Sequence, residues 1–343
     1  MGIGIFWVLF AAVLLGFYAL PSKYTKNYEI ENVWGTFWFL AMFVVPIAST
    51  ALLVNGAADT FKQVPVDILL LVIGLGGVWG VGNLLWGISI AKIGMALGFS
   101  LLIGVATLSG TLLPFFMGGG VEKLSTPGGM VILAGVFVIM LGIMANGKAG
   151  LLREKAENEG KQDASSSANM RIGIILCVIG GISAAGFNLA YFIADSMGNI
   201  GAISQEQFGN PPWVARLAVM LPAFVGSGIT TVGYFATDLS KKKSWGNFTQ
   251  KESGRNIFLL LIMSIVYCGS LIIYGLGAYE LGELGTSVGF AIFQTGCIIV
   301  ANLLGVFTGE WKQAGKTSQA WLVGGLAVMV IGIIIVAYGN SIS

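Results

Sequence analysis

Long apolar runs separated by short polar stretches make up most of this 343-residue chain. A membrane-spanning helix needs about 20 consecutive apolar residues, and ten runs approach that length. Their approximate bounds are 3–20, 34–54, 67–91, 95–117, 128–146, 171–195, 213–237, 256–277, 285–308 and 320–338. The pattern predicts an all-α polytopic membrane protein with ten transmembrane helices.

Composition narrows the classes of function. The hydrophobic fraction is 56%, the charged fraction is 10% and the mean hydropathy is +0.85, which excludes an ordinary soluble globule and a disordered chain. Histidine is absent, which excludes histidine-ligated zinc, a Ser-His-Asp triad and a histidine proton relay. The net charge of +2 gives no electrostatic case for nucleic acid. No nucleophile–base pair, metal cluster or P-loop appears, so we predict no enzyme, no metal and no cofactor.

Positive charge is concentrated in alternate loops. Fifteen of the 18 Lys and Arg residues follow odd-numbered spans. Because cytoplasmic loops carry the excess of Lys and Arg, we predict that these loops are cytoplasmic and that both termini face the outside of an inner membrane. Residues 147–170 are charged and predict a solvated cytoplasmic linker between a first half, 1–146, and a second half, 171–343.

The second five spans repeat the first five. The segment 94–99, GMALGF, opens span four, and its counterpart 285–290, GTSVGF, opens span nine. Spans five and ten each carry glycines seven residues apart. Because five is odd, the second copy enters the membrane from the opposite side. This predicts two inverted five-helix repeats, a substrate site near the midplane and alternating access.

Some of the 51 glycines are placed where helices can approach closely. Gly76-x-x-x-Gly80 in span three is one such motif. Two further series place a glycine every seven residues: Gly128, Gly135 and Gly142, then Gly325, Gly332 and Gly339. Three roles remain open for these seams, namely internal packing, sliding between the halves, or contact in a homodimer.

Aromatic and amide residues form a candidate sugar site. Trp79, Asn83 and Trp86 lie on one face of span three, and the repeat puts Tyr267 and Tyr274 at equivalent positions of span eight. Rings stack on the C–H face of a sugar, and its hydroxyls need polar partners. The candidate hydroxyl partners are Tyr18, Asn83, Asn188, Tyr191, Gln294 and Thr295. Packing rings and interhelical hydrogen bonds are the competing explanations.

Charge near the outer ends of the spans is the second candidate feature. Asp195, Arg216 and Glu280 are placed there, and a charge costs roughly 2.5–3.5 kcal/mol at a helix centre, so it is usually paired or functional. Without histidine, proton coupling needs a carboxylate. Asp195 and Glu280 are the candidates, with Arg216 biasing the protonation. Snorkelling to water is the competing explanation, and it is stronger for Glu283 than for Asp195.

The segment Trp79-Gly80-Val81-Gly82-Asn83, followed by Gly94-Met95 and Gly110-Thr111-Leu112, resembles the signature region of the L-rhamnose–proton symporter family. That family belongs to the drug/metabolite transporter superfamily. The opening Gly4-Ile5-Phe6-Trp7 and the pair Glu310-Trp311 also resemble it, so the likeness covers the whole chain. The resemblance implies a ten-helix inner-membrane carrier that imports L-rhamnose, or a similar 6-deoxyhexose, with protons.

These patterns together predict a secondary active transporter whose partners are a small sugar, protons and the lipid bilayer. Trp79, Trp86, Tyr267 and Tyr274 would stack the sugar. One alternative is an exporter or exchanger of another small metabolite on the same scaffold. Arg216 adds a second alternative, a carrier of a sugar acid. The lack of a soluble output domain disfavours a membrane sensor.

Overall fold

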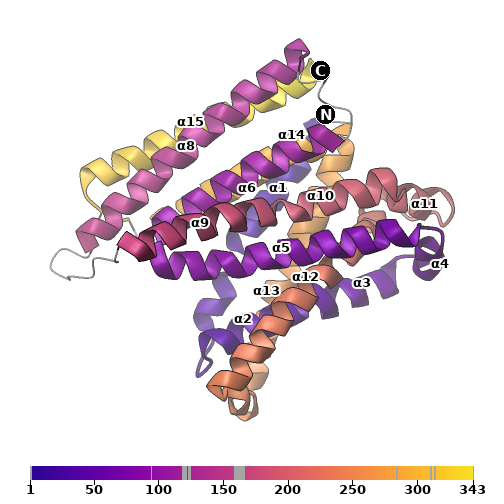
Figure 1. Ribbon diagram of the computed structural model, residues 1–343, viewed down its shortest axis with the longest axis horizontal. Helices are drawn as coiled ribbons and strands as arrows, with labels where there is room; N and C mark the ends of the chain where they lie inside the picture. The colour runs from indigo at the N-terminus through magenta and orange to yellow at the C-terminus, as the bar shows by residue number, and fades with distance from the viewer. Residues whose placement is uncertain are drawn as a thin grey trace. The chain divides into compact units, whose positions relative to one another are not determined.

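The computed structural model describes residues 2–93, 95–117, 122, 125–157, 167–282, 285–309, 311–312 and 314–342. Within these ranges every regular element is a helix (Figure 1). Nine helical segments in the described part are long and apolar enough to cross a membrane, as an all-α polytopic membrane protein requires. The predicted span 95–117 is also helical, as α6 (Met95–Met117), but only Ser100–Pro114 qualifies there, as a shorter apolar helix. The count of ten therefore stays a prediction.

The helices follow the predicted apolar runs closely. The long ones are α1 (Gly2–Phe17), α5 (Val66–Ile93), α6, α8 (Pro127–Glu157), α9 (Ser167–Ala184), α12 (Pro212–Lys242), α13 (Ser253–Glu280), α14 (Gly285–Phe307) and α15 (Lys316–Ser341). The short ones are η1 (Leu20–Tyr24), α2 (Ile30–Phe39), η2 (Leu40–Val44), α3 (Val45–Leu53), α4 (Ala57–Lys62), α10 (Gly186–Phe192), η3 (Ile193–Met197), α11 (Ile200–Glu206) and η4 (Ser244–Thr249).

Two predicted spans contain a π-helical turn. η2 lies between α2 and α3, and η3 continues α10. A π-helical turn interrupts the regular backbone hydrogen bonds of an α-helix. In lipid, each carbonyl that loses its backbone donor needs another donor. Around η2, Cys268 Sγ donates to the Ala41 carbonyl at 3.0 Å and Ser264 Oγ donates to the Phe37 carbonyl at 3.3 Å. Side chains of α13 thus compensate the irregular turn.

The predicted linker begins later than the apolar run suggests. Helix α8 continues past residue 146 to Glu157, and α9 begins at Ser167. Ala149 is fully buried because Trp311 and neighbouring apolar residues cover it, and Ser318 Oγ donates to its carbonyl at 2.7 Å. Packing against a distant segment therefore keeps polar sequence helical. The rest of the linker, 158–166, and the predicted sites Gly94, Glu283 and Glu310 lie outside the described residues.

The chain divides into two compact units. Unit 1 contains 1–12, 82–185 and 277–343, and unit 2 contains 13–81 and 186–276. The division falls within α1, α5 and α13 and between α9 and α10. Each unit therefore takes residues from both halves of the sequence, so the two predicted repeats are not the two compact units.

In unit 1, α8 and α15 pack side by side (Figure 1). A Cβ on Gly142 would lie 2.9 Å from the Gly325 carbonyl oxygen, and one on Gly339 would lie 3.0 Å from that of Gly128. The contacts run in opposite sequence directions, so the helices are antiparallel. The two predicted glycine seams therefore face each other within the chain and allow close packing of α8 on α15.

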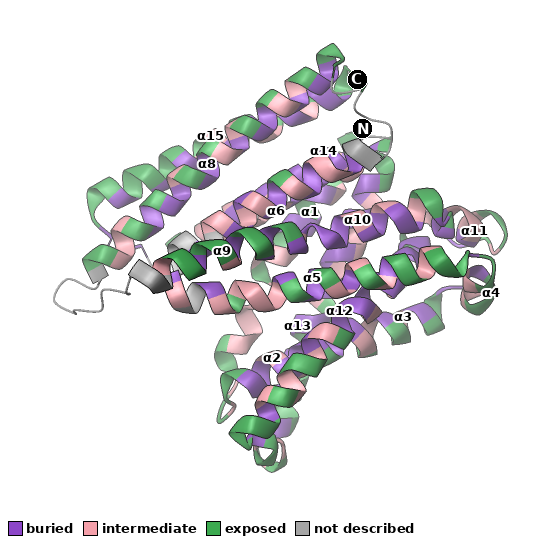
Figure 2. Ribbon diagram, in the orientation of Figure 1, coloured by how far each residue is buried: buried purple, intermediate pink, exposed green. Residues whose placement is uncertain are grey.

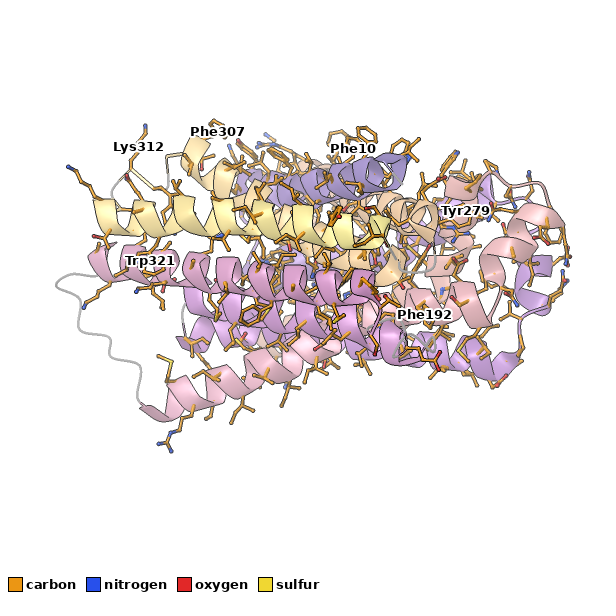
Figure 3. The ribbon with its side chains drawn as sticks, turned by 90° about the horizontal axis from the view of Figure 1, so that it is seen from above. Phe10, Phe192, Tyr279, Phe307, Lys312 and Trp321 are labelled. Carbon is orange, nitrogen blue, oxygen red and sulfur yellow. The ribbon has the colours of Figure 1, made fainter. Side chains whose placement is uncertain are left out.

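The outer side chains of unit 1 are apolar. Buried residues alternate with exposed ones along α8 and α15 (Figure 2). Phe10 on α1 and Phe307 on α14 point away from their helices (Figure 3), and Phe307 is 83% exposed. Exposed apolar side chains at this density are expected where lipid, rather than water, is the solvent.

In unit 2, α5 and α12 approach closely through glycines. A Cβ on Gly76 would lie 2.2 Å from the Ala223 carbonyl oxygen, and one on Gly80 would lie 2.8 Å from that of Ser227. Thr230 Oγ1 adds a hydrogen bond of 3.1 Å to the carbonyl of Gly77. The prediction of a close-approach motif at Gly76 and Gly80 is confirmed.

Two asparagines hold the loops at the ends of unit 2. Asn32, near the start of α2, donates from Nδ2 to the Ser244 carbonyl at 3.0 Å, just after α12 ends. Asn210, just before α12, donates from Nδ2 to the Asn55 carbonyl at 2.9 Å and accepts from the Asn55 backbone N–H, just after α3 ends. Asn32 thus lies at the start of the segment formed by α2 and α3 and binds the loop after α12. Asn210 lies at the start of α12 and binds the loop after α3.

Candidate functional site

Two aromatic clusters lie in unit 2 and contain three of the predicted rings. Tyr267 on α13 packs against Tyr18, with ring centroids 5.1 Å apart, and against Phe37 at 5.3 Å. Trp79 on α5 packs against Phe187 on α10 at 4.8 Å and against Phe224 on α12. The two predicted positions Trp79 and Tyr267 are thus each covered by rings from the other half of the sequence.

Tyr274 connects the second aromatic cluster to polar groups. Its ring lies 6.0 Å from that of Phe187 and 6.2 Å from that of Tyr191. The Tyr274 hydroxyl donates to Asn188 Oδ1, and the Tyr191 hydroxyl donates to the Gly275 carbonyl at 2.8 Å. Asn188 and Tyr191 share a face of α10 because they are three residues apart. The predicted residues of spans six and eight therefore meet.

A buried ion pair adjoins these tyrosines. Arg216 is fully buried, and its Nη1 donates to Asp195 Oδ2 at 2.6 Å and to Tyr191 Oη at 3.0 Å. The Asp195 side chain is 23% exposed, so it is the member of the pair that reaches solvent. A charge-assisted bond of this length is strong, and removing one partner strands a buried charge at a cost of about 3–5 kcal/mol.

The backbone around this pair is adapted to it. Asp195 lies in the π-helical turn η3, whose widened geometry ends with the Gly198 N–H donating to the Ile193 carbonyl at 2.9 Å. Gly201, in the first turn of α11, leaves room for both charges. A Cβ there would overlap both Arg216 Nη2 and Asp195 Oδ1. Only glycine fits that position while the ion pair keeps its place.

The structure brings together six of the predicted residues in one connected set. They are Trp79, Asn188, Tyr191, Asp195, Arg216 and Tyr274. Tyr18 and Tyr267 form the other aromatic cluster of the same unit. The set offers ring faces, hydroxyls, an amide and a paired charge, which is the chemistry that a sugar and a proton need.

The remaining predicted site residues belong to unit 1. Trp86 packs beside the cluster of Ile93, Leu102 and Cys177. Asn83 is half-buried, and Thr295 is buried with its hydroxyl bonded to the Ala291 carbonyl at 2.6 Å. Gln294 is half-buried on α14, and Glu280 is exposed at the end of α13.

Two residues of this set, and Glu31 near the start of α2, are not predicted from the sequence. Gly201 lies in a short helix outside the predicted spans, and Phe187 is one of many apolar residues within span six. Glu31 begins a span, where a carboxylate is ordinary, and its burial depends on contacts more than 200 residues away. No group of three or more His, Cys, Asp or Glu residues that could hold a metal occurs in the part of the chain that the structure describes.

Similarity to known proteins extends over the full chain. The family model described as L-rhamnose-proton symport protein matches residues 1–342. The L-rhamnose-proton symporters of Salmonella dublin, Salmonella enteritidis PT4 and Salmonella gallinarum are each 27% identical over 348 residues, covering 98% of this chain and of each relative. The family is one of transport proteins, which confirms the prediction of a carrier rather than an enzyme. The chain belongs to the L-rhamnose-proton symport protein family.

Proposed function

We propose that the chain imports L-rhamnose, or a similar monosaccharide, together with protons, by alternating access. The full-length family match carries this proposal. The connected set of rings, hydroxyls and the Arg216–Asp195 pair supports it, because it combines groups for a sugar with a carboxylate that a proton can reach. Asp195 is the stronger candidate for the proton, since Glu280 has no comparable cation partner among the salt bridges described.

Backbone conformation supports two inverted five-helix repeats. Left-handed residues occur at equivalent places of the two halves: Asn27 before α2 and Gly209 before α12, then Gly56 before α4 and Lys243 before η4. The reciprocal bonds of Asn32 and Asn210 follow the same symmetry. The antiparallel packing of α8 on α15, the fifth and tenth predicted spans, is what an odd-numbered repeat requires.

The aromatic rings supply the sugar-stacking surface of the proposal. Trp79 and Tyr267 occupy equivalent positions of the repeats and lie near the middle of α5 and α13. Carriers built from inverted repeats bind substrate near the bilayer midplane. Tyr274, Asn188 and Tyr191 then provide hydroxyl and amide partners, and Asn83, Trp86, Gln294 and Thr295 remain proposed partners from unit 1.

Coupling of proton binding to sugar binding follows from the guanidinium of Arg216, which Asp195 and the sugar would both contact. With Asp195 ionised, Arg216 is balanced and a sugar gains little by approaching it. When Asp195 takes a proton, Arg216 loses its counter-charge, and a sugar hydroxyl that accepts from the guanidinium becomes more favourable. Proton binding and sugar binding then favour each other, as linkage requires of a symporter. The odd-numbered loops are cytoplasmic in this proposal, so Asp195 faces the outside.

The same ion pair bears on the alternatives. With Asp195 ionised, the charge of Arg216 is balanced and the site holds no surplus positive charge. The proposed protonation of Asp195 uncovers Arg216, so a sugar acid stays an alternative cargo beside a neutral sugar. Export or exchange of another metabolite remains the alternative outcome of the test.

Labelled L-rhamnose uptake by cells that express the chain tests the proposal, with unlabelled monosaccharides and sugar acids as competitors. We expect uptake that neutral 6-deoxyhexoses inhibit, that a protonophore abolishes and that Asp195→Asn reduces strongly. Uptake that survives both Asp195→Asn and Glu280→Gln and ignores the protonophore would contradict the coupling. Net efflux, or competition by acids alone, would favour an alternative cargo or direction.

A further inference from the structure

Glu31 is the most deeply buried carboxylate of the described residues. It is the second residue of α2, and only 4% of its surface is exposed. Burial of an ionised carboxylate is costly unless charge and hydrogen bonds compensate it. A buried carboxylate in a chain without histidine is therefore a candidate for carrying a proton.

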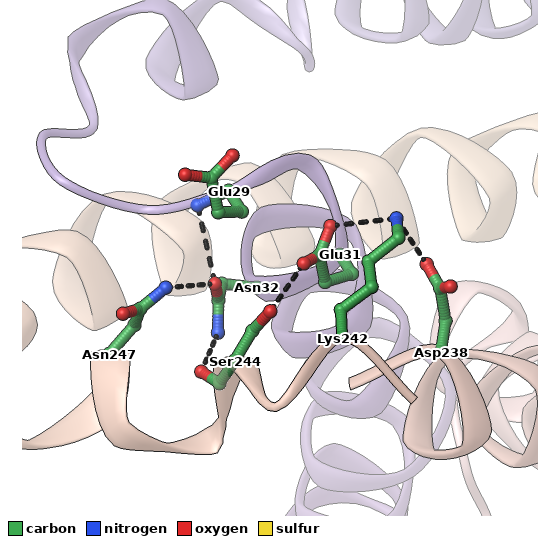
Figure 4. A network of polar contacts seen from close by, with 7 residues as sticks. All are labelled: Glu29, Glu31, Asn32, Asp238, Lys242, Ser244 and Asn247. Carbon is green, nitrogen blue, oxygen red and sulfur yellow. Dashed lines mark hydrogen bonds and ion pairs between the residues drawn. The ribbon is translucent and has the colours of Figure 1, made fainter. Parts of the chain in front are cut away.

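The groups that compensate the charge of Glu31 come from the C-terminal end of α12 and from η4, which follows it (Figure 4). Ser244 Oγ donates to Glu31 Oε1, and Lys242 Nζ donates to Oε2 at 3.1 Å. Lys242 also donates to Asp238 Oδ2 at 2.9 Å. The Lys242 side chain is 51% exposed, so water reaches the cation that touches the buried carboxylate.

With Lys242 and Ser244 in contact, the ionised form of Glu31 is favoured, so a proton that Glu31 carries would be released in this conformation. Lys242 is shared between two carboxylates, so when Glu31 is neutral the ammonium still has Asp238 and water. The Ser244 hydroxyl can donate to an ionised carboxylate and accept from a protonated one. At the Arg216–Asp195 pair, by contrast, a proton on Asp195 leaves a fully buried cation without its counter-charge, which a bound sugar would then have to compensate.

Lys242 from α12 contacts Glu31, Asp238 from the same helix binds Lys242 from its other side, and Glu29 immediately precedes α2 (Figure 4). Glu29 is exposed, and its backbone N–H donates to Asn32 Oδ1 at 3.2 Å. From η4 only the uncharged Ser244 contacts the carboxylate. Lys242 thus pairs with two carboxylates, the buried Glu31 and the partly exposed Asp238.

Glu31 and Asp195 mark opposite ends of one helix. Arg216 is the fifth residue of α12 and Lys242 is its last, about 39 Å apart at 1.5 Å per residue. The loops at the Glu31 end are the ones that carry the positive charge of the cytoplasmic face in the proposed orientation. Helix α2 also carries Phe37, whose ring packs on Tyr267.

We propose that Glu31 is a second proton-binding carboxylate of the transport cycle, at the cytoplasmic end, from which protons leave to the cytoplasm. The inference rests on the proposed proton symport. Asp195 receives protons from outside, and Glu31 releases them beside the solvated Lys242. The step is a transfer of a proton from the Glu31 carboxyl oxygen to water and changes no other bond.

Purified chain in proteoliposomes separates this role from a structural one. Two assays are needed: exchange of labelled for unlabelled L-rhamnose at equal pH, and accumulation driven by an imposed pH gradient. We expect Glu31→Gln to keep exchange while its accumulation ratio falls to about 1, because sugar movement is no longer linked to the proton gradient. Glu29→Gln, which changes an exposed carboxylate just before the same helix, should keep both activities.

Several results would overturn the inference. They are accumulation by Glu31→Gln equal to that of the unaltered chain, or loss of exchange together with accumulation in a folded protein. If Glu31→Gln does not fold, Glu31→Asp decides, and it should shift the pH dependence of accumulation; an unchanged profile overturns the inference. Absence of both exchange and accumulation in the unaltered chain would instead refute the proposed symport.

Discussion

Arg216 shows at the scale of one residue how a membrane helix accommodates a full charge. The guanidinium is buried, yet it contacts a carboxylate and a tyrosine hydroxyl. Asp195 stays beside it because η3 and Gly201 leave room. The sequence places both charges near one end of their spans. Their pairing geometry could not be predicted, because it depends on a π-helical turn and a short helix without any sequence signature.

Removing both charges should be less harmful than removing one. We expect Asp195→Ala to destabilise the folded chain by about 3–5 kcal/mol, since Arg216 is left buried without a counter-ion. The double variant Asp195→Ala with Arg216→Met should recover most of that stability. Thermal unfolding in detergent measures the difference. Additive losses from the two substitutions would show that the residues do not interact.

Gly201 should be intolerant of a single methyl group. A Cβ there overlaps both Arg216 and Asp195, so we expect Gly201→Ala to cost about 1–3 kcal/mol and to reduce L-rhamnose uptake. Gly233→Ala in α12 is the matched control, because nothing lies within 4 Å of its Cβ position. Equal unfolding temperatures for the two variants would refute the account of this position.

At the scale of helices, the spacing of glycines predicts where two helices pack closely, whereas the apolar pattern does not predict where α8 ends. The motif at Gly76 and Gly80 predicts close packing, and α12 approaches there. Which partner the seams of α8 and α15 use could not be read from spacing, since packing, sliding and dimer contact all need small residues. The end of α8 was misplaced because the covering Trp311 lies far along the chain.

Two adjacent glycines of α15 test the seam. Gly325 faces α8, where its Cβ would lie 2.9 Å from the Gly142 carbonyl oxygen, whereas Gly324 has nothing within 4 Å. We expect Gly325→Ala to lower the unfolding temperature by an amount equivalent to about 1–3 kcal/mol, and Gly324→Ala to leave it nearly unchanged. The same loss from both substitutions would mean that the contact is not responsible.

At the scale of the whole chain, the sequence predicts a topology whose orientation and inverted repeats stay proposals. Charge counting predicts the orientation and repeat matching predicts inversion, while left-handed residues at matching positions support the duplication. The repeats nevertheless do not coincide with compact units, because helices of both halves pack together. Pattern matching along one chain identifies copies but not which helices associate.

The orientation can be tested by cysteine labelling. In a chain whose three native cysteines are replaced, Glu206→Cys should react with a membrane-impermeant maleimide added outside cells, because it precedes α12 on the outer face. Gly246→Cys, in η4 after α12, should react only after the membrane is opened. The opposite pattern would place the basic loops outside, and it would exchange the membrane faces that the proposal assigns to Asp195 and Glu31.

The central claim is that sugar and protons move together through this chain. The most direct measurement uses purified chain in proteoliposomes that hold a pH indicator, with the membrane potential clamped and no pH gradient imposed. Addition of L-rhamnose outside should acidify the interior, and Asp195→Asn should abolish the signal while leaving the protein folded. Entry of labelled L-rhamnose without acidification, or no entry at all, would contradict the account.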